Sequence, residues 1–121
     1  MAKILIIDDS LADLYKLKKI VETGGHEVVT AEDGEHGLRS AKLINPDLIL
    51  MDVIMPGISG YEATRTLKKD IGTREIPVIF VTSKSLETDK IWGLRQGAEA
   101  YITKPVNEHK LLTAIEQTLA T

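Results

Sequence analysis

Short runs of apolar residues alternate along this chain with longer stretches in which apolar residues recur every three or four positions. The runs near residues 5, 50 and 79 are rich in Ile, Val and Leu and show little polar alternation, which is typical of strands buried on both faces of a sheet. The pattern predicts five strands, at Lys3–Ile7, Glu27–Thr30, Leu48–Met51, Val78–Val81 and Ala100–Thr103.

A helix is predicted after each strand, because an apolar stripe with helical spacing follows each run. Glycine or proline marks several helix ends, and aspartate or asparagine marks possible amino-terminal caps. The predicted helices, in chain order, contain Leu14, Leu17 and Val21 before Gly24 and Gly25; Leu38, Ala41 and Ile44 between Asp33 and Pro46; residues 60–69; residues 86–96 before Gly97; and Leu111, Leu112, Ile115 and Leu119 after Asn107.

Five strands that alternate with five helices favour an α/β fold with a parallel sheet and helices on both faces. Right-handed crossovers restrict the topology, and the flavodoxin-like, doubly wound strand order 2-1-3-4-5 is expected. A barrel needs about eight such units and is too large for this chain. We expect residues 1–121 to form a single domain.

Composition and charge exclude several classes of function. The net charge is −3, from 15 basic and 18 acidic residues without a basic patch, so neither nucleic-acid binding nor a nucleic-acid partner is expected. The chain has no cysteine, which excludes thiol chemistry and is compatible with the cytoplasm. The apolar run at residues 4–7 is too short to insert into a membrane. The three scattered histidines are expected at the surface rather than as metal ligands.

Polar residues follow four of the predicted strands where each strand ends. Asp8 and Asp9 follow the first strand, Asp52 the third, Thr82 the fourth and Lys104 the fifth. Singly, each has an ordinary explanation as a helix cap, a loop acid or a solvated lysine. Together they predict one crevice, because the carboxyl ends of parallel strands share one edge of the sheet.

Three carboxylates in one crevice repel one another. Two unit charges about 4 Å apart cost roughly 4 kcal/mol at an effective dielectric constant of about 20. Lys104 supplies one compensating charge, and Mg²⁺ is the expected cofactor because the available ligands are hard oxygens. An aspartate beside Mg²⁺ and a lysine suits transfer of a phosphoryl group to Asp52.

Two other functions use similar parts. A Mg²⁺-dependent phosphatase with an aspartate nucleophile usually has a second acid two residues later, but here that position is Ile54. A flavodoxin-like flavin carrier needs glycines and hydroxyls after the first strand, where this chain has Asp8 and Asp9. Phosphatase activity on small substrates would favour the first function, and a yellow purified protein the second.

The same residues carry a resemblance to a known family. The whole chain resembles the receiver domains of two-component response regulators of the chemotaxis-regulator type, through residues 3–10, 51–57, 81–83 and 101–105. Within that family it is most similar to receivers of twitching-motility pathways, on residues 14–17 and 88–98. The resemblance implies a phosphorelay protein that is not an enzyme beyond its own phosphotransfer and autodephosphorylation.

The resemblance also implies a role for each site residue. Asp52 would be the phosphoacceptor, supplied by a histidine kinase. Asp9, Asp52 and the backbone carbonyl of Ile54 would bind Mg²⁺, with Asp8 acting through a metal-bound water. The phosphoryl oxygens would be contacted by Lys104 and Thr82, Tyr101 would be the aromatic switch, and Lys104–Pro105 a cis bond.

An effector would then bind the face formed by the helix at residues 86–96, the strand at 100–103 and the last helix. Trp92 is expected to lie partly exposed on this face with Lys90 and Arg95, while Ile91 and Leu94 face the sheet. In the alternative, Trp92 packs onto neighbouring elements as ordinary half-buried surface. The chain is expected to be a monomer, and it could either signal to an effector or drain phosphoryl groups from a shared kinase.

Overall fold

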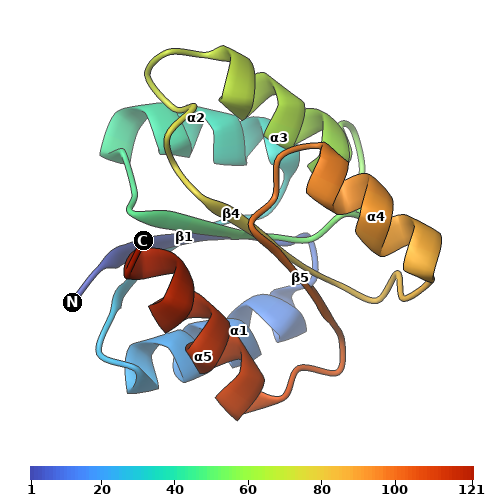
Figure 1. Ribbon diagram of the computed structural model, residues 1–121. Helices are drawn as coiled ribbons and strands as arrows, with labels where there is room; N and C mark the ends of the chain where they lie inside the picture. Colours follow the sequence, from blue (N-terminus) through green and yellow to red (C-terminus); the bar gives the residue numbers. More distant parts are fainter.

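The computed structural model describes residues 1–121 and contains a five-stranded parallel sheet between two layers of helices (Figure 1). The strand order is β2-β1-β3-β4-β5, so the predicted topology is confirmed. The strands are β1 (Lys3–Ile7), β2 (Glu27–Ala31), β3 (Leu48–Met51), β4 (Val78–Thr82) and β5 (Ala100–Thr103). The helices are α1 (Leu11–Thr23), α2 (Gly34–Ile44), α3 (Gly60–Lys69), α4 (Glu87–Arg95) and α5 (Glu108–Leu119).

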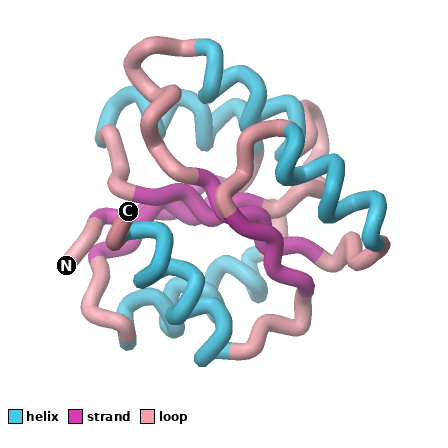
Figure 2. The backbone as a smooth tube through the Cα atoms, in the orientation of Figure 1, coloured by secondary structure: helices cyan, strands magenta, loops and turns pink.

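The sheet separates the core into two halves. Alternate residues of β1 point to opposite faces, so that Leu5 and Ile7 pack with α2 and α3, while Ile4 and Ile6 pack with α1 and α5. Figure 2 shows these two helical layers above and below the strands. Strands β3 and β4 are buried throughout and β1 nearly so, whereas the edge strands β2 and β5 are partly exposed.

Local sequence explains where several helices begin. The side chains of Asp33 and Asn107 accept hydrogen bonds from backbone N–H groups in the first turns of α2 and α5, so both predicted caps are confirmed. Ser10 caps α1 in the same way by accepting a hydrogen bond from Asp13 N–H. This last cap fixes the start of α1 directly beside the end of β1.

Two expectations about individual side chains are wrong. His26 is buried rather than on the surface: its Nδ1 accepts a hydrogen bond from Ala2 N–H, and its Nε2 lies 3.0 Å from Glu116 Oε2. Ile91 and Leu94 do not turn into the sheet, since each is 48% exposed. No helix of the chain is long and apolar enough to cross a bilayer.

Candidate functional site at the ends of the strands

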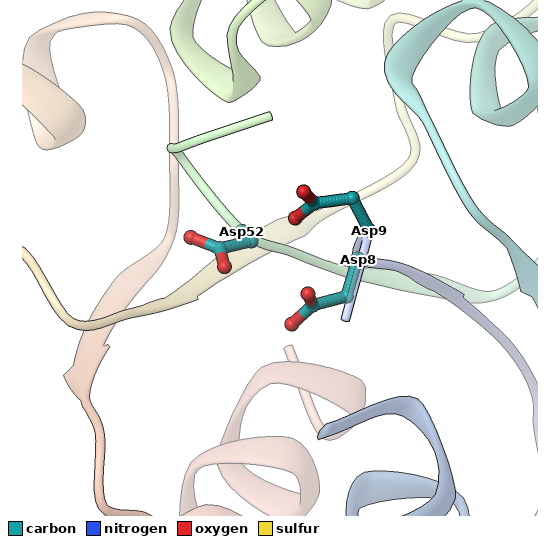
Figure 3. A group of neighbouring side chains, drawn as sticks. All are labelled: Asp8, Asp9 and Asp52. Atoms are coloured by element: carbon teal, nitrogen blue, oxygen red, sulfur yellow. The ribbon is translucent and has the colours of Figure 1, made fainter. Parts of the chain in front are cut away.

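Three aspartates meet where β1 and β3 end. The two strands are parallel neighbours in which Ile7 pairs with Met51, so the residues that follow, Asp8 and Asp9 on one strand and Asp52 on the other, lie side by side. Figure 3 shows their three carboxylates grouped around one space. One oxygen from each lies within 4.8 Å of the others. The structure therefore brings together the three acids that the sequence predicted.

Lys104 enters this group from the end of β5. Its Nζ donates hydrogen bonds to Asp8 Oδ2 at 2.8 Å, to Asp52 Oδ2 at 3.0 Å and to Asp13 Oδ2 at 2.7 Å. An ammonium has three donors, so these bonds use all of them. The Lys104 side chain is only 15% exposed, and the peptide bond to Pro105 is cis, as expected.

Asp13 is a member of this site that the sequence analysis missed. It occupies the third position of α1, whose amino-terminal end lies beside Asp8 and Asp9. Helical side chains lean toward the amino terminus of their helix, so an acid in the first turn can reach back over the strand ends. An aspartate four residues after the Asp8-Asp9 pair was the signal that could have identified it.

Burial and hydrogen bonding shift the pKa values of the site residues in opposite directions. Burial raises the pKa of Asp8, although hydrogen bonds from Lys104 and Ser10 act against this shift. Burial alone would lower the pKa of Lys104, but its bonds to Asp13, Asp8 and Asp52 outweigh that cost and raise the pKa well above its usual range. The hydrogen bond from Lys104 lowers the pKa of Asp13. Lys104 is therefore charged at neutral pH.

The donor set fits a hard divalent cation. Lys104 bonds to the carboxylates of Asp8, Asp13 and Asp52, and Asp9 adds a fourth carboxylate to the group, which leaves an excess of negative charge. Asp9 is exposed, while Asp8 and Asp52 are buried. Carboxylate oxygens are the ligands that Mg²⁺ prefers. These residues could therefore hold Mg²⁺ at the mouth of the crevice.

The loop after β3 is held tightly against the site. The Ile54 backbone N–H donates to Asp52 Oδ1 at 3.1 Å, while the Ile54 side chain is 54% exposed. Gly60, the first residue of α3, packs so closely that a Cβ there would lie 2.3 Å from the Asp52 carbonyl oxygen. Only glycine permits this approach, which fixes the backbone of Asp52.

Thr82 and Tyr101 are linked through one residue. Thr82 ends β4, is fully buried, and its Oγ1 accepts a hydrogen bond from Lys84 N–H at 3.4 Å. The Tyr101 hydroxyl donates to the Lys84 carbonyl oxygen at 2.9 Å, and its ring packs edge-on against Phe80. Burial raises the pKa of Tyr101, so this hydroxyl keeps its proton at neutral pH. A path of contacts thus runs from the end of β4 to the edge strand β5.

The expected partner surface lies at the far end of this path. Trp92 is 49% exposed on α4, between Lys90 and the exposed Arg95. A hollow of about 340 Å³ on this face is lined by residues of α4, β5 and α5, among them Lys90, Tyr101 and Lys110. The chain therefore has an exposed aromatic and several cations on the face where an effector was expected.

A model of the family described as "Response regulator receiver domain" matches residues 4–116. The chain belongs to this receiver domain family. The family relationship explains why Asp8, Asp9, Asp52, Thr82 and Lys104 occur together, since the match spans all of them. Phosphorylation and Mg²⁺ binding are typical of receiver domains, which interact with histidine kinases and downstream effectors and are generally signalling proteins rather than enzymes.

Individual relatives agree with this assignment. The chain is 53% identical over 120 residues to Protein PilH of Pseudomonas aeruginosa, with 99% of each chain covered. Its fold matches chemotaxis protein CheY4 of Vibrio cholerae, with a TM-score of 0.90, 30% identity and 98% of each chain covered. The expected likeness to receivers of the PilH type is confirmed.

A further solved relative bears on the metal. The receiver domain of a sensor histidine kinase from Pseudomonas aeruginosa has a TM-score of 0.92 and 28% identity, covering 99% of this chain and 98% of its own. That structure has a magnesium ion coordinated in the active-site cleft.

Proposed function

We propose that this receiver is a phosphorylation-driven switch in which Asp52 accepts a phosphoryl group from a histidine kinase. The observation that carries the proposal is the position of Lys104 Nζ, which lies within hydrogen-bonding distance of both Asp8 and Asp52 at the ends of the strands. A buried carboxylate beside a fixed ammonium is the arrangement that favours arrival of a phosphoryl group, because the added negative charge is compensated in place.

The phosphoryl group passes from a phosphohistidine of the kinase to Asp52. An oxygen of the Asp52 carboxylate forms a bond to phosphorus while the phosphorus–nitrogen bond breaks. The imidazole leaves with the electron pair and takes up a proton from solvent. Lys104 moves one of its three hydrogen bonds to a phosphoryl oxygen, and the Thr82 hydroxyl donates to another. Both groups already lie at strand ends beside Asp52.

The metal has a defined role in this scheme. Asp9, Asp52 and the Ile54 carbonyl would hold Mg²⁺, with Asp8 in an indirect contact. When bound, Mg²⁺ would neutralise charge on the phosphoryl oxygens and so lower the barrier to transfer.

The switch follows from the path through Lys84. When Thr82 turns toward the phosphoryl group, its contact with Lys84 N–H changes, and the partner of the Tyr101 hydroxyl moves with it. The face formed by α4, β5 and α5 then changes its shape, and so does its affinity for an effector. Thermodynamically, phosphorylation shifts the populations of two existing conformations. The size of this shift is limited by the difference between the free energies with which the phosphoryl group interacts with the two conformations.

Likeness to PilH supports a role in twitching motility or a related chemotaxis-like pathway. In that pathway the chain could signal to an effector or drain phosphoryl groups from a shared kinase. The lifetime of phosphorylated Asp52 distinguishes the two, because a drain must turn over quickly. A Mg²⁺-dependent phosphatase is a weaker proposal, since the exposed Ile54 stands where such an enzyme needs a second acid.

Phosphorylation by acetyl phosphate with Mg²⁺ tests the proposal. We expect the wild-type protein to gain the mass of one phosphoryl group, and Asp52→Asn to gain none while remaining folded. Asp47→Asn is a matched control, because Asp47 lies at the opposite end of β3, where it accepts a hydrogen bond from Lys3 N–H. An Asp52→Asn protein that is phosphorylated as fully as wild type would overturn the assignment.

A further inference from the structure

Gly93 is the one buried residue of α4. A Cβ at this position would lie 2.8 Å from Cδ2 and 2.9 Å from Cε2 of the Tyr101 ring, and 3.1 Å from Cδ2 of Phe80. Real Cβ atoms essentially never lie within 3.0 Å of another atom, and 3.1 Å is also unusually short, so a larger residue at this position must displace the ring or the helix. The ring of Tyr101 therefore packs directly against the backbone of α4, with no side chain between them.

The backbone conformation gives no other reason for a glycine at this position. Gly93 is not among the glycines with positive φ, so an alanine could adopt its dihedral angles. Glycine in a helix interior costs about 1 kcal/mol relative to alanine. The space above Gly93, which the ring fills, is therefore the feature that requires glycine.

The apolar side chains that flank Gly93 supply only part of the contact between α4 and its neighbours, to which the Tyr61 hydroxyl adds a hydrogen bond to the Asp89 carbonyl oxygen at 3.1 Å. Ile91, Trp92 and Leu94 are each about half exposed. The contact between Gly93 and Tyr101 is therefore a main point at which α4 rests on the sheet. Moving the ring and moving the helix are consequently coupled.

We propose that Gly93 is a positioning residue that seats the Tyr101 ring inward, and so presets the face formed by α4, β5 and α5. The seat consists of Gly93, Phe80 and the Lys84 carbonyl oxygen. Gly93 and Phe80 lie outside the carboxylate site, so this part of the seat favours the inward ring whether or not Asp52 is phosphorylated. This inference deepens the proposed function and rests on the face formed by α4, β5 and α5 being its reporting surface.

A ring that is already seated does not need to turn inward when Asp52 is phosphorylated. In a receiver whose tyrosine is already seated, the change on phosphorylation must come from movement of α4 and the segment around Lys84 together with the seated ring, rather than from a ring that turns inward. Adding a single methyl group at position 93 should restore a tyrosine that moves, because it removes the seat.

Fluorine NMR of protein labelled with 3-fluorotyrosine tests this. The label enters Tyr15, Tyr61 and Tyr101, and a Tyr101→Phe variant identifies the third signal. In unphosphorylated wild type we expect the Tyr101 signal to be shielded from a soluble paramagnetic agent. In Gly93→Ala we expect severalfold greater broadening, approaching that of Tyr15, which is 61% exposed.

Thr88→Ala is the matched control. It also places alanine in α4, but at an exposed position away from the ring, so it improves helix propensity without filling the seat. We expect its Tyr101 signal to broaden as in wild type. A Gly93→Ala protein whose Tyr101 stays shielded would overturn the proposal, including the case in which only the environment of Trp92 changes because α4 has moved.

A measurement on wild type keeps the proposal testable if Gly93→Ala fails to fold. Proton NMR should show a nuclear Overhauser effect between the Tyr101 ring and the Gly93 α-protons, both before and after treatment with acetyl phosphate. Absence of this effect before treatment would overturn the seat. Failure of Asp52 to gain a phosphoryl group would instead overturn the proposed function and leave the seat intact.

Discussion

The acidic site and helix α4 are held in place by opposite means. At the site, Lys104 bonds to three carboxylates at 2.7 to 3.0 Å, and Asp8 and Asp52 are buried. On α4, the apolar side chains are about half exposed, and Gly93 is the one buried residue. Charge therefore fixes the first region, whereas the second has few contacts to resist movement.

This difference suits a protein that receives a signal in one place and reports it in another. A phosphoryl acceptor needs fixed groups, because catalysis here depends on positioning. A reporting surface needs two arrangements of similar free energy. Lys84 joins the regions, since its N–H contacts Thr82 and its carbonyl oxygen accepts the Tyr101 hydroxyl.

Removing the Lys104 ammonium should cause the largest loss of stability at the acidic site. Lys104→Met leaves buried carboxylates without their counter-charge, and loss of one partner from a buried pair costs about 3 to 5 kcal/mol. We expect a loss of this size in the free energy of unfolding, measured with urea at neutral pH without Mg²⁺. Lys110→Met, at an exposed position on α5, should change stability by less than about 0.5 kcal/mol.

Addition of Asp8→Asn to Lys104→Met should recover part of the loss, because it removes one uncompensated charge. A Lys104→Met protein as stable as the Lys110→Met control would show that the carboxylates at the site do not depend on the ammonium.

Mg²⁺ should strengthen the same region through Asp9. A ligand present at about a hundredfold excess over its Kd stabilises a protein by about 2.7 kcal/mol. We expect Mg²⁺ to raise the melting temperature of wild type but not of Asp9→Asn, which lacks an exposed carboxylate of the cluster. Glu22→Gln removes the same charge from an exposed position near the far end of α1 and should respond to Mg²⁺ like wild type. An equal response in Asp9→Asn would argue against a metal at this site.

Removing Trp92 tests the second region. Because this side chain is 49% exposed, Trp92→Ala should cost less than about 1.5 kcal/mol of stability. Tryptophan is a frequent binding anchor, so affinity for the effector or kinase should fall at least about tenfold, or 1.4 kcal/mol. Calorimetric titration with the partner measures this. Tyr15→Ala, on α1, removes another exposed aromatic and should leave effector affinity unchanged. A loss of several kcal/mol of stability with normal binding would place Trp92 in the core instead.

The two regions also differ in how far the sequence predicts them. Asp8, Asp52 and Lys104 could be placed together because each directly follows a strand, and parallel strands end at one edge. Asp13 could not be placed in this way, because it lies on a helix and its contact depends on where α1 begins beside β1. That start is fixed by Ser10, whose side chain accepts a hydrogen bond from Asp13 N–H.

Helix α4 shows the limit more clearly. A spacing of three residues suggested that Ile91 and Leu94 face the sheet, yet both are half exposed and Gly93 lies inward. Periodicity identifies a buried face only when apolar side chains make that face. Here the inward position belongs to a residue without a side chain, and the apolar bulk comes from Tyr101 on β5.

The smallest effect is expected at Asp13, where the fixed site meets solvent. Its hydrogen bond to Lys104 lowers its pKa in the folded protein below the ordinary value of 3.8. Such a group stabilises the fold above its unfolded pKa, and the stabilisation is lost as the pH falls through the folded pKa. The side chain is 36% exposed, so solvent screening limits this contribution to about 0.5 kcal/mol.

We therefore expect Asp13→Asn to be less stable than wild type by about that amount at neutral pH, and the two proteins to become equally stable once the pH has fallen below the lowered pKa of Asp13 in the folded state. Urea unfolding at several pH values, with Glu22→Gln as a control, measures the difference. Asp8 responds in the opposite sense, because its raised pKa gives stability that is lost as the pH rises through the folded pKa. Subtracting the wild-type curve from the Asp13→Asn curve cancels this Asp8 contribution to first order. A difference that persisted unchanged in acid would mean that Asp13 acts through packing rather than through its charge.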